Sequence, residues 1–493
     1  MKSLTSRLRL VLPLLASGLA ANIASAQPDD ATGVTFTTLH SFCLQSGCPD
    51  GTEVQAGLIQ TTTGDLYGTT YLGGDTSGDT NCAPSGCGTI FKITPSGALT
   101  TVYSFHCLGP CSAFPTAGLI QAANGELYGT TAEGARSSGS IFRMNPGGAP
   151  AIVYSFGLQA GDGEGPDAAM IQTANGNLYG TTYDGGSGAY GTVFKITPGG
   201  TLTTLYSFCY QTSCAGGANP SVGLIQAANG DIYGTSLGGI YSASCLLGCG
   251  TVFKITPAGM LTTLYSFCSQ AGCTDGQGPS SLVQAGNGDL YGTTAAGGIA
   301  NVSCTYGGCG TIFKITSTGT LTTVYSFCSN GGACTDGFAP LGGLVQAASG
   351  NLYGTTAAGG AHDHGTIFKI TPSGALSTLY SFCAQAECPD GFNPGALVQA
   401  TNGIFYGTTN NGGASANCDG GCGTIFALST GQAPFVETRP TIGVVGEVVT
   451  ILGYKLTGTT SVTFNGIPAA FTVDAATAIT TTVPTARPQA RSR

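Results

Sequence analysis

Short segments rich in apolar, β-branched and aromatic residues recur along most of the chain, separated by turn residues. In the first copy these segments are residues 56–60, 66–70, 88–94 and 99–105, and Gly, Pro, Ser and Asp concentrate between them. This composition predicts strands, and the short Gly- and Pro-containing connections predict antiparallel turns. We therefore expect units of four antiparallel strands, labelled a to d in chain order.

Seven copies of this unit follow one another, and the tyrosines of strand b are 51 to 62 residues apart. A period near fifty residues made of short strands predicts a repeat architecture, and four-stranded units around a ring form a β-propeller. The expected fold class is all-β, with a seven-bladed β-propeller. Three aromatic positions mark the copies: Tyr67, Tyr128, Tyr179, Tyr233, Tyr291, Tyr353 and Tyr406 in strand b; Phe91, Phe142, Phe194, Phe253, Phe313, Phe368 and Phe426 in strand c; and Phe42, Phe105, Phe156, Phe208, Phe267, Phe327 and Phe382 at the end of strand d.

The two ends of the repeated region are complementary. The region begins with a lone d strand at residues 35–42 and ends with strands a, b and c at residues 395–399, 404–409 and 423–428. Pairing the first strand with the last three would complete the seventh unit and remove an exposed strand edge. We therefore expect a propeller closed by an N-terminal strand.

The remaining segments give the domain organisation. A basic start, a short apolar run and a small-residue site at residues 24–26 predict a signal peptide over residues 1–26; an uncleaved membrane anchor is the alternative. The propeller then covers 27–428 and a linker covers 429–434. Residues 435–484 predict a second all-β module, with a strand at 448–453 and a hairpin of 461–464 and 467–473 around Asn465-Gly466. Residues 485–493 are expected to be a disordered tail.

Charge and hydropathy restrict the classes of partner. Only 8% of residues are charged, and the net charge is −9. A nucleic-acid surface needs clustered Lys and Arg, so no nucleic-acid partner is expected. Beyond the signal segment no stretch is long and apolar enough to span a membrane, so no span is expected after cleavage. The expected location is the periplasm, the cell surface or the extracellular space.

Twenty cysteines fall into ten close pairs, which predict disulfides in an exported chain. Zinc is the alternative, but structural zinc sites favour tighter pairs, and the chain holds only four histidines. Every pair follows strand b or strand d, so all ten are expected on one face, here called the loop face. Stiffened, variable loops favour ligand binding there; resistance to proteolysis is the alternative role. The pairs are Cys43/Cys48, Cys82/Cys87, Cys107/Cys111, Cys209/Cys214, Cys245/Cys249, Cys268/Cys273, Cys304/Cys309, Cys328/Cys334, Cys383/Cys388 and Cys418/Cys422.

Oppositely charged residues recur at two positions of the unit, one before strand b and one in strand c. Both positions become apolar in the last unit, as Ile404 and Ala427. In an antiparallel hairpin the two positions are neighbours on one face, so we expect structural cross-strand pairs. These are Asp65 with Lys92, Glu126 with Arg143, Asp231 with Lys254 and Asp289 with Lys314, and Asn177 and Asn351 replace the acid in two further units.

The sequence assigns no catalytic residue and no cofactor-binding residue, because no acid–base constellation stands outside the repeated positions. Asp-Gly loops after strand d are expected to be turns, with calcium binding as the alternative at Asp50, Asp275, Asp336 and Asp390. His362-Asp363-His364 offers metal ligands, but no third ligand lies nearby in sequence, so we interpret it as a polar loop tip. No other metal or cofactor is expected.

Two families resemble parts of the sequence. The unit AGLIQ…GDLYGTT…GG…GTIFKITPSG…LTTLYSF resembles the GloVer-type tandem repeat of choice-of-anchor bacterial proteins, over about residues 35–428. This resemblance implies an exported bacterial protein whose C-terminus carries an anchoring or accessory segment. VGEVVTILGYKLTGTTSVTFNGIPAAFTV…ITTTVP is similar to an IPT/TIG domain, which implies a small immunoglobulin-like β-sandwich. Such domains continue with a further strand that residues 485–493 lack, so this sandwich is expected to be incomplete.

The sequence therefore predicts an exported, non-catalytic repeat protein. It would act as a cell-surface or secreted scaffold that binds a glycan or protein ligand through the disulfide-stiffened loop face. The alternative is a propeller enzyme that acts on polysaccharide through acidic residues of the loops between strands d and a. A glycosidase needs two carboxylates at a defined separation, and buried carboxylates with shifted pKa values in one pocket would favour it.

Overall fold

The computed structural model describes residues 10–12, 14–15, 18–19, 33–75, 82, 85–106, 113–132, 138–209, 214–239, 248–301, 304, 307–329, 333–439 and 445–485. Within these residues the structure is all-β, with two short 3-10 turns, η2 (Ala271–Cys273) and η3 (Leu456–Gly458). The described part of the chain has no helix long and apolar enough to cross a membrane. Of the predicted signal peptide, the structure describes only β1 (Leu10–Leu12), β2 (Leu14–Leu15) and β3 (Gly18–Leu19). The predicted cleavage site lies outside the described residues.

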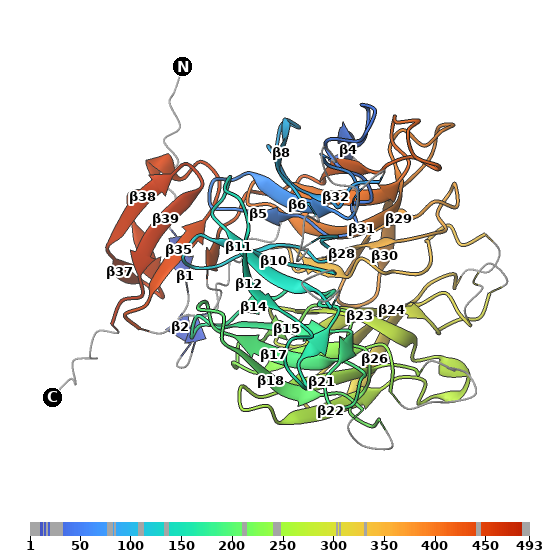
Figure 1. Ribbon diagram of the computed structural model, residues 1–493, viewed down its shortest axis with the longest axis horizontal. Coiled ribbons are helices and arrows are strands. Elements are labelled where there is room, and N and C mark those ends of the chain that lie inside the picture. Colours follow the sequence, from blue (N-terminus) through green and yellow to red (C-terminus); the bar gives the residue numbers. More distant parts are fainter. Residues whose placement is uncertain are drawn as a thin grey trace.

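Seven four-stranded sheets make up the repeated region (Figure 1). In each sheet strands a, b, c and d lie side by side in this order, as the sequence predicts. Sheets 1 to 3 are β5 (Ile59–Gln60), β6 (Leu66–Thr70), β7 (Thr89–Ile93) and β8 (Leu99–Ser104); β9 (Ile120–Gln121), β10 (Leu127–Thr131), β11 (Ser140–Met144) and β12 (Ala151–Ser155); and β14 (Ile171–Gln172), β15 (Leu178–Thr182), β17 (Thr192–Ile196) and β18 (Leu202–Ser207). The short strands β13 (Gly163–Glu164) and β16 (Asp184–Gly185) pair beside sheet 3.

Sheets 4 to 7 repeat this order. They are β19 (Ile225–Gln226), β20 (Ile232–Ser236), β21 (Thr251–Ile255) and β22 (Leu261–Ser266); β23 (Gln277–Gln284), β24 (Leu290–Ala296), β25 (Thr311–Ile315) and β26 (Leu321–Ser326); β27 (Leu344–Gln346), β28 (Leu352–Thr356), β29 (Thr366–Ile370) and β30 (Leu376–Ser381); and β31 (Phe392–Gln399), β32 (Phe405–Asn411), β33 (Thr424–Ser429) and β4 (Thr35–Ser41). The fourth strand of sheet 7 therefore comes from the N-terminal side of the chain.

The recurring glycine of strand b follows from packing inside each sheet. Gly68 lies opposite Phe91 in the neighbouring strand. A Cβ atom at Gly68 would lie 2.5 Å from Cζ of that ring, closer than real Cβ atoms approach other atoms. The same arrangement occurs in the other six sheets, at Gly129, Gly180, Gly234, Gly292, Gly354 and Gly407. Strand b therefore needs glycine so that the strand c phenylalanine can fill the core.

Each sheet contacts the next through the same pair of phenylalanines. The phenylalanine that ends strand d lies edge-on to the strand c phenylalanine of the following sheet, with ring centroids 5.1–5.6 Å apart. Buried aromatic pairs of this kind contribute about 0.5–1.5 kcal/mol each beyond the area they bury. The pairs are Phe105–Phe142, Phe156–Phe194, Phe208–Phe253, Phe267–Phe313, Phe327–Phe368, Phe382–Phe426 and Phe42–Phe91. The last of them joins sheet 7 to sheet 1, so the sheets form a closed ring.

The two ends of the repeated region close this ring. β4 pairs antiparallel with β33, with Ser41 opposite Thr424 and Thr35 opposite Ser429. In Figure 1 the blue strands from the start of the region lie beside the orange strands of sheet 7. The predicted pairing of the lone d strand with the last three strands is therefore present.

A proline–glycine contact occurs at six of the seven junctions between sheets. The proline near the start of strand a packs against the glycine that precedes strand c of the previous sheet. At Gly310, for example, φ is +92°, and a Cβ atom would lie 2.7 Å from Cδ of Pro340. Both the positive φ and the close approach require glycine. At the closing junction the fully buried Val54 takes the place of the proline.

The C-terminal module has two sheets. One contains β34 (Glu437–Arg439), β35 (Val448–Leu452), β39 (Ala478–Thr482) and β38 (Phe471–Ala475); the other contains β36 (Val462–Phe464), β37 (Ile467–Ala469) and β1, which runs parallel to β36. The predicted turn is present, since Asn465 and Gly466 have φ of 49° and 77°. The predicted single strand over 467–473 is wrong. It divides at Ala470, whose carbonyl accepts a hydrogen bond from Thr481 Oγ1 at 2.8 Å, and β38 pairs with β39.

The module packs on the ring beside the closing junction. Thr401 Oγ1 of sheet 7 donates to the Gly453 carbonyl at 3.0 Å, and Thr477 Oγ1 donates to the Thr62 carbonyl of sheet 1 at 2.7 Å. The Phe435 amide also donates to the Thr401 carbonyl at 3.0 Å. The module and its linker therefore cover the start of strand b in sheet 7. This contact gives a physical reason for the loss of the charged pair in that repeat, where Ile404 follows shortly after Thr401.

Candidate functional site

The cysteine loops are closed by short-range disulfides. Among the described residues the structure contains eight, and none of the described cysteines is free. They join Cys43 to Cys48, Cys82 to Cys87, Cys209 to Cys214, Cys268 to Cys273, Cys304 to Cys309, Cys328 to Cys334, Cys383 to Cys388 and Cys418 to Cys422. Cys249 is also disulfide-bonded, whereas Cys107, Cys111 and Cys245 lie outside the described residues.

Aspartates of the Asp-Gly loops anchor these loops to strand d. The Tyr325 hydroxyl and the Cys328 amide both donate to Asp336 Oδ2 at 2.9 Å. Burial, and then the hydrogen bond to Asp336, raise the pKa of Tyr325 to about 12. The same tyrosine–aspartate bond, at 2.8–2.9 Å, joins Tyr154 to Asp162, Tyr265 to Asp275 and Tyr380 to Asp390. These carboxylates therefore hold the loops after strand d against the sheets, and the loops of Asp275, Asp336 and Asp390 each carry a disulfide.

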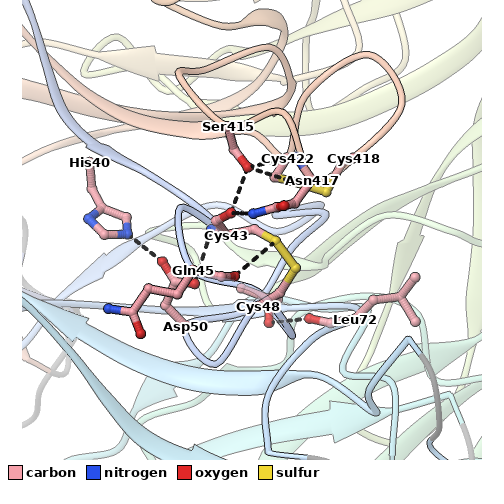
Figure 2. The surroundings of a disulfide bond; sticks show 11 residues. His40, Cys43, Gln45, Cys48, Asp50, Leu72, Ser415, Asn417, Cys418 and Cys422 are labelled. Atoms are coloured by element: carbon pink, nitrogen blue, oxygen red, sulfur yellow. Dashed lines mark hydrogen bonds and ion pairs between the residues drawn. A yellow bond between two sulfur atoms is a disulfide. The ribbon is translucent and has the colours of Figure 1, made fainter.

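Sheet 7 uses a different anchor, because His40 occupies the position of the tyrosine. His40 Nε2 lies 2.8 Å from Asp50 Oδ2, and the Cys43 amide donates to Asp50 Oδ1 at 3.0 Å (Figure 2). Among the four calcium candidates, one carboxylate oxygen each of Asp275 and Asp390 is buried with no hydrogen-bond partner in the described structure. Calcium binding at these loops stays the alternative to the plain turns expected there.

The charged residues of the b–c hairpins lie close together. Lys92 Nζ is 3.5 Å from Asp65, Arg143 is 3.9 Å from Glu126, Lys254 is 3.4 Å from Asp231 and Lys314 is 3.7 Å from Asp289. Their side chains are 22–45% exposed, so each pair contributes roughly 0–1 kcal/mol. These residues belong to the scaffold and line neither of the two pockets described below.

A polar pocket of about 410 Å³ lies where the ring closes. Glu53 and Gln55, which precede β5, line one side; Asn410, Asn411 and Asp419, which end or follow β32, line the other. The pocket therefore forms only when the two ends of the repeated region meet. Asn410 Oδ1 is buried and has no hydrogen-bond partner in the described structure. A buried, unpaired amide oxygen costs about 1–3 kcal/mol.

A second pocket, of about 360 Å³, lies at sheet 3 and includes Gln159, Asp162 and Tyr206. Asp162 there is already bonded to the Tyr154 hydroxyl at 2.9 Å. Nearby in sequence, burial raises the pKa of Asp167, although a hydrogen bond from Thr116 lowers it. Asp167 does not line either of these two pockets.

The pocket residues at the closing junction were not predicted from the sequence. A signal was present, because these residues depart from the repeat. Val54 follows Glu53 where the other six units have proline, and Asn410-Asn411 stands where sheet 5 has Ala295-Ala296. Departures from a repeat mark positions whose role is not to build the sheet.

The structure also gives His364 neighbours that the sequence did not predict. Its ring nitrogen and the sulfurs of Cys383 and Cys388 lie within 4.8 Å of one another. The isolated polar loop tip expected at residues 362–364 is therefore adjacent to a cysteine pair from the loop after strand d. This proximity is a contact between the b–c loop and the following loop of sheet 6.

Comparisons with known proteins place the chain in a repeat family. The sequence profile of the Gloeobacter/Verrucomicrobia repeat matches residues 28–174, 80–306 and 305–443. A comparison with curated proteins gave no match. Among solved structures, a fungal alcohol oxidase of the AA5 family, in complex with copper, is similar over 91% of this chain and 92% of that chain, with 13% identity and a TM-score of 0.51.

An extracellular domain of a hybrid two-component system from B. thetaiotaomicron is similar over 85% of this chain, with 10% identity and a TM-score of 0.49. This chain spans 41% of the length of that protein. At such identities a likeness concerns the fold alone. The family profile, in contrast, covers well over half of the chain, and the protein belongs to the Gloeobacter/Verrucomicrobia repeat family.

Proposed function

We propose that the seven sheets are the blades of a closed seven-bladed β-propeller, and that the C-terminal module is an incomplete immunoglobulin-like domain of the IPT/TIG type. The seven equivalent phenylalanine contacts and the pairing of β4 with β33 support the propeller. The protein is an exported, non-catalytic scaffold, at the cell surface or secreted, that binds its ligand on the loop face. Its many disulfides support a location outside the cytoplasm, because disulfides persist in oxidising compartments.

The pocket at the closing junction is the binding site in this proposal. The observation that carries it is that Asn410, whose Oδ1 is buried and unpaired, lines a pocket with amide and carboxylate side chains on both walls. Buried polar groups normally have partners, so an orphaned acceptor in a pocket favours a ligand that donates a hydrogen bond. The pocket volume of about 410 Å³ falls within the range of small-ligand sites.

The lining favours a neutral, hydroxyl-rich ligand, and we propose a segment of glycan. Gln55 and Asn411 offer both donors and acceptors, as sugar hydroxyls require. Glu53 and Asp419 place two carboxylates in the same pocket, and the chain carries a net charge of −9. An anionic ligand would meet repulsion there, so uronic or sulfated sugars are disfavoured.

The test is a screen of neutral oligosaccharides, followed by calorimetry on the best binder with an Asn410→Ala variant. Loss of one hydrogen bond, about 1–1.5 kcal/mol, weakens binding by roughly 5- to 12-fold. Gln159→Ala, on the same face but in the second pocket, is the matched control and keeps wild-type affinity. If Asn410→Ala and Gln55→Ala both bind as tightly as the wild type, the closing pocket is not the site.

A second function rests on the two carboxylates of this pocket. Glu53 and Asp419 line it together, and glycoside hydrolysis uses two carboxylates on either side of the scissile bond. The candidate is therefore an enzyme that acts on polysaccharide with these two side chains. Glu53→Gln distinguishes the two functions: it removes turnover of a bound glycan if the protein is an enzyme and leaves only an affinity change if it is a scaffold.

A further inference from the structure

We propose that the reduced protein binds a zinc-type divalent ion through four cysteines at the closing junction. These residues, here called the closing cluster, are Cys43, Cys48, Cys418 and Cys422. In the oxidised protein they form two disulfides, each within its own loop (Figure 2). Reduction gives four thiols at one place, and a metal ion there would join the N-terminal strand β4 to the last repeat.

The four sulfurs are already close enough to act as one ligand set. All four Sγ atoms lie within 4.8 Å of one another. With Zn–S bonds of about 2.3 Å, the sulfurs of a tetrahedral site lie about 3.8 Å apart, so small side-chain shifts are sufficient. Cys43 and Cys422 are 0% and 1% exposed, whereas Cys48 and Cys418 are partly buried, so two of the four ligands are shielded from water.

Hydrogen bonds also hold the two loops together. Ser415 Oγ donates to the Cys43 carbonyl at 2.6 Å, and Asn417 Nδ2 donates to the same oxygen at 2.7 Å (Figure 2). The Cys43 amide is in turn held by Asp50 at 3.0 Å. These hydrogen bonds join the two loops at atoms other than the disulfide sulfurs. This preorganisation reduces the ordering that metal binding has to impose.

The same meeting of two cysteine pairs recurs elsewhere on the loop face. In sheet 5, Cys304 and Cys309 lie between β24 and β25, and Cys328 and Cys334 follow β26. Their four sulfurs also lie within 4.8 Å, and Cys304 Sγ is 3.7 Å from Cys328 Sγ although the two belong to different disulfides. All four residues are buried, at 0–8% exposure. The sequence argument against zinc rested on the spacing within each pair and on the small number of histidines, whereas the fold brings two pairs together.

The b–c loop of sheet 6 carries His364, whereas the b–c loops of sheets 5 and 7 each carry a second cysteine pair. His364 Nδ1 donates to the His362 carbonyl at 2.6 Å, which leaves Nε2 as the unprotonated nitrogen of the neutral ring. Metal-binding histidines are commonly oriented by such a bond from the other ring nitrogen. The b–c loop thus supplies a metal-ligating residue type next to Cys383 and Cys388, a pattern that disulfide formation alone does not explain.

The reaction needs a thiol reductant. Two equivalents of a dithiol reduce the two disulfides of the closing cluster to four thiols, and the dithiol is oxidised to its own disulfide. Binding of one divalent ion then forms four metal–sulfur bonds and releases four protons to solvent. Thiolates select zinc-type ions, and a closed four-sulfur site is typical of a structural role.

The test uses the full chain, reduced anaerobically without denaturant, separated from reductant and titrated with Co²⁺ as a spectroscopic probe. The wild type is expected to show the sulfur-to-cobalt charge-transfer absorption of tetrahedral thiolate sites. Cys418→Ser with Cys422→Ser is expected to bind one equivalent fewer. Cys43→Ser with Cys48→Ser, the other half of the cluster, gives the same loss and guards against misfolding of either variant.

The matched control is Cys209→Ser with Cys214→Ser, because the b–c loop of sheet 3 supplies no cysteine or histidine beside that pair. This control keeps the full Co²⁺ stoichiometry. Absence of the charge-transfer band, or equal stoichiometry in the closing-cluster variants and the wild type, would overturn the proposal. A thiol count showing that the closing cluster cannot be reduced in the folded protein would overturn it as well.

Discussion

Replacement of Tyr325 by phenylalanine tests whether the tyrosine–aspartate bond anchors a disulfide loop. The substitution removes only the hydroxyl that donates to Asp336 at 2.9 Å and leaves the ring in place. Asp336 is 8% exposed, so its carboxylate loses a donor that water replaces poorly. A hydrogen bond to a charged group contributes about 1.5–3 kcal/mol, and we expect the free energy of unfolding to fall by that amount.

The expected shift in Tm follows from the number of residues in the seven-sheet region. An unfolding entropy of about 2.1 cal/mol/K per residue over roughly 400 residues gives about 0.8 kcal/mol/K, so Tm falls by about 2–4 °C. Tyr206→Phe is the matched control, because Gly216 stands in its loop where the aspartate stands in the loop of sheet 5. Burial alone raises the pKa of Tyr206, so removal of its hydroxyl is expected to change Tm by less than Tyr325→Phe does.

The assay is calorimetry of the oxidised wild type and both variants at pH 7, with limited proteolysis of the loop as a local readout. Faster cleavage near residues 328–334 in Tyr325→Phe alone would agree with loss of the anchor. Equal Tm values for the two variants would refute the reasoning, since the aspartate is the only intended difference between the sites.

Three further predictions concern pH, a junction and the closing strand. The pKa of Tyr325 is raised from its ordinary value near 10 to about 12, so the folded state favours the protonated hydroxyl. This stabilisation is complete below about pH 10 and is lost between about pH 10 and 12. Chemical denaturation of the wild type and of Tyr325→Phe across that pH range measures the loss. Gly310→Ala places a Cβ against Pro340 at positive φ and is expected to lower the free energy of unfolding by at least about 1–3 kcal/mol. A decrease of less than about 1 kcal/mol in urea unfolding would contradict the packing argument. His40→Tyr restores the residue of the other repeats opposite Asp50 and is expected to keep the wild-type Tm, whereas His40→Ala lowers it; equal losses in both variants would contradict the role assigned to this bond.

Most of the sheet architecture could be predicted because it follows from local patterns that occur seven times. The strand segments, their order within a sheet and the closing role of residues 35–42 all depend on where apolar residues and turn residues stand. The glycine that recurs in strand b of every copy also indicates a position without room for a side chain. Its partner, the strand c phenylalanine, becomes clear only from the register of the two strands.

The candidate sites were harder to predict, because they depend on which loops meet in space. Asn410 and Glu53 lie at opposite ends of the repeated region and share a pocket only after ring closure. The four sulfurs of the closing cluster are likewise brought together by the fold. The division of residues 467–473 into two strands of different sheets was missed for a similar reason, since a hairpin signal does not specify which neighbour the second half will pair with.

The pairing of β4 with β33 also has a consequence for the order of events during synthesis and export. β4 leaves the ribosome early, but its partner residues lie almost four hundred positions later, as Ser41 opposite Thr424 illustrates. Until the seventh repeat is made, β4 is a strand with free edges in a growing chain. Long-range pairings of this kind form slowly and leave strand edges exposed to aggregation. The disulfide between Cys43 and Cys48 needs only a local loop, so it can form at the end of β4 long before that strand finds its sheet.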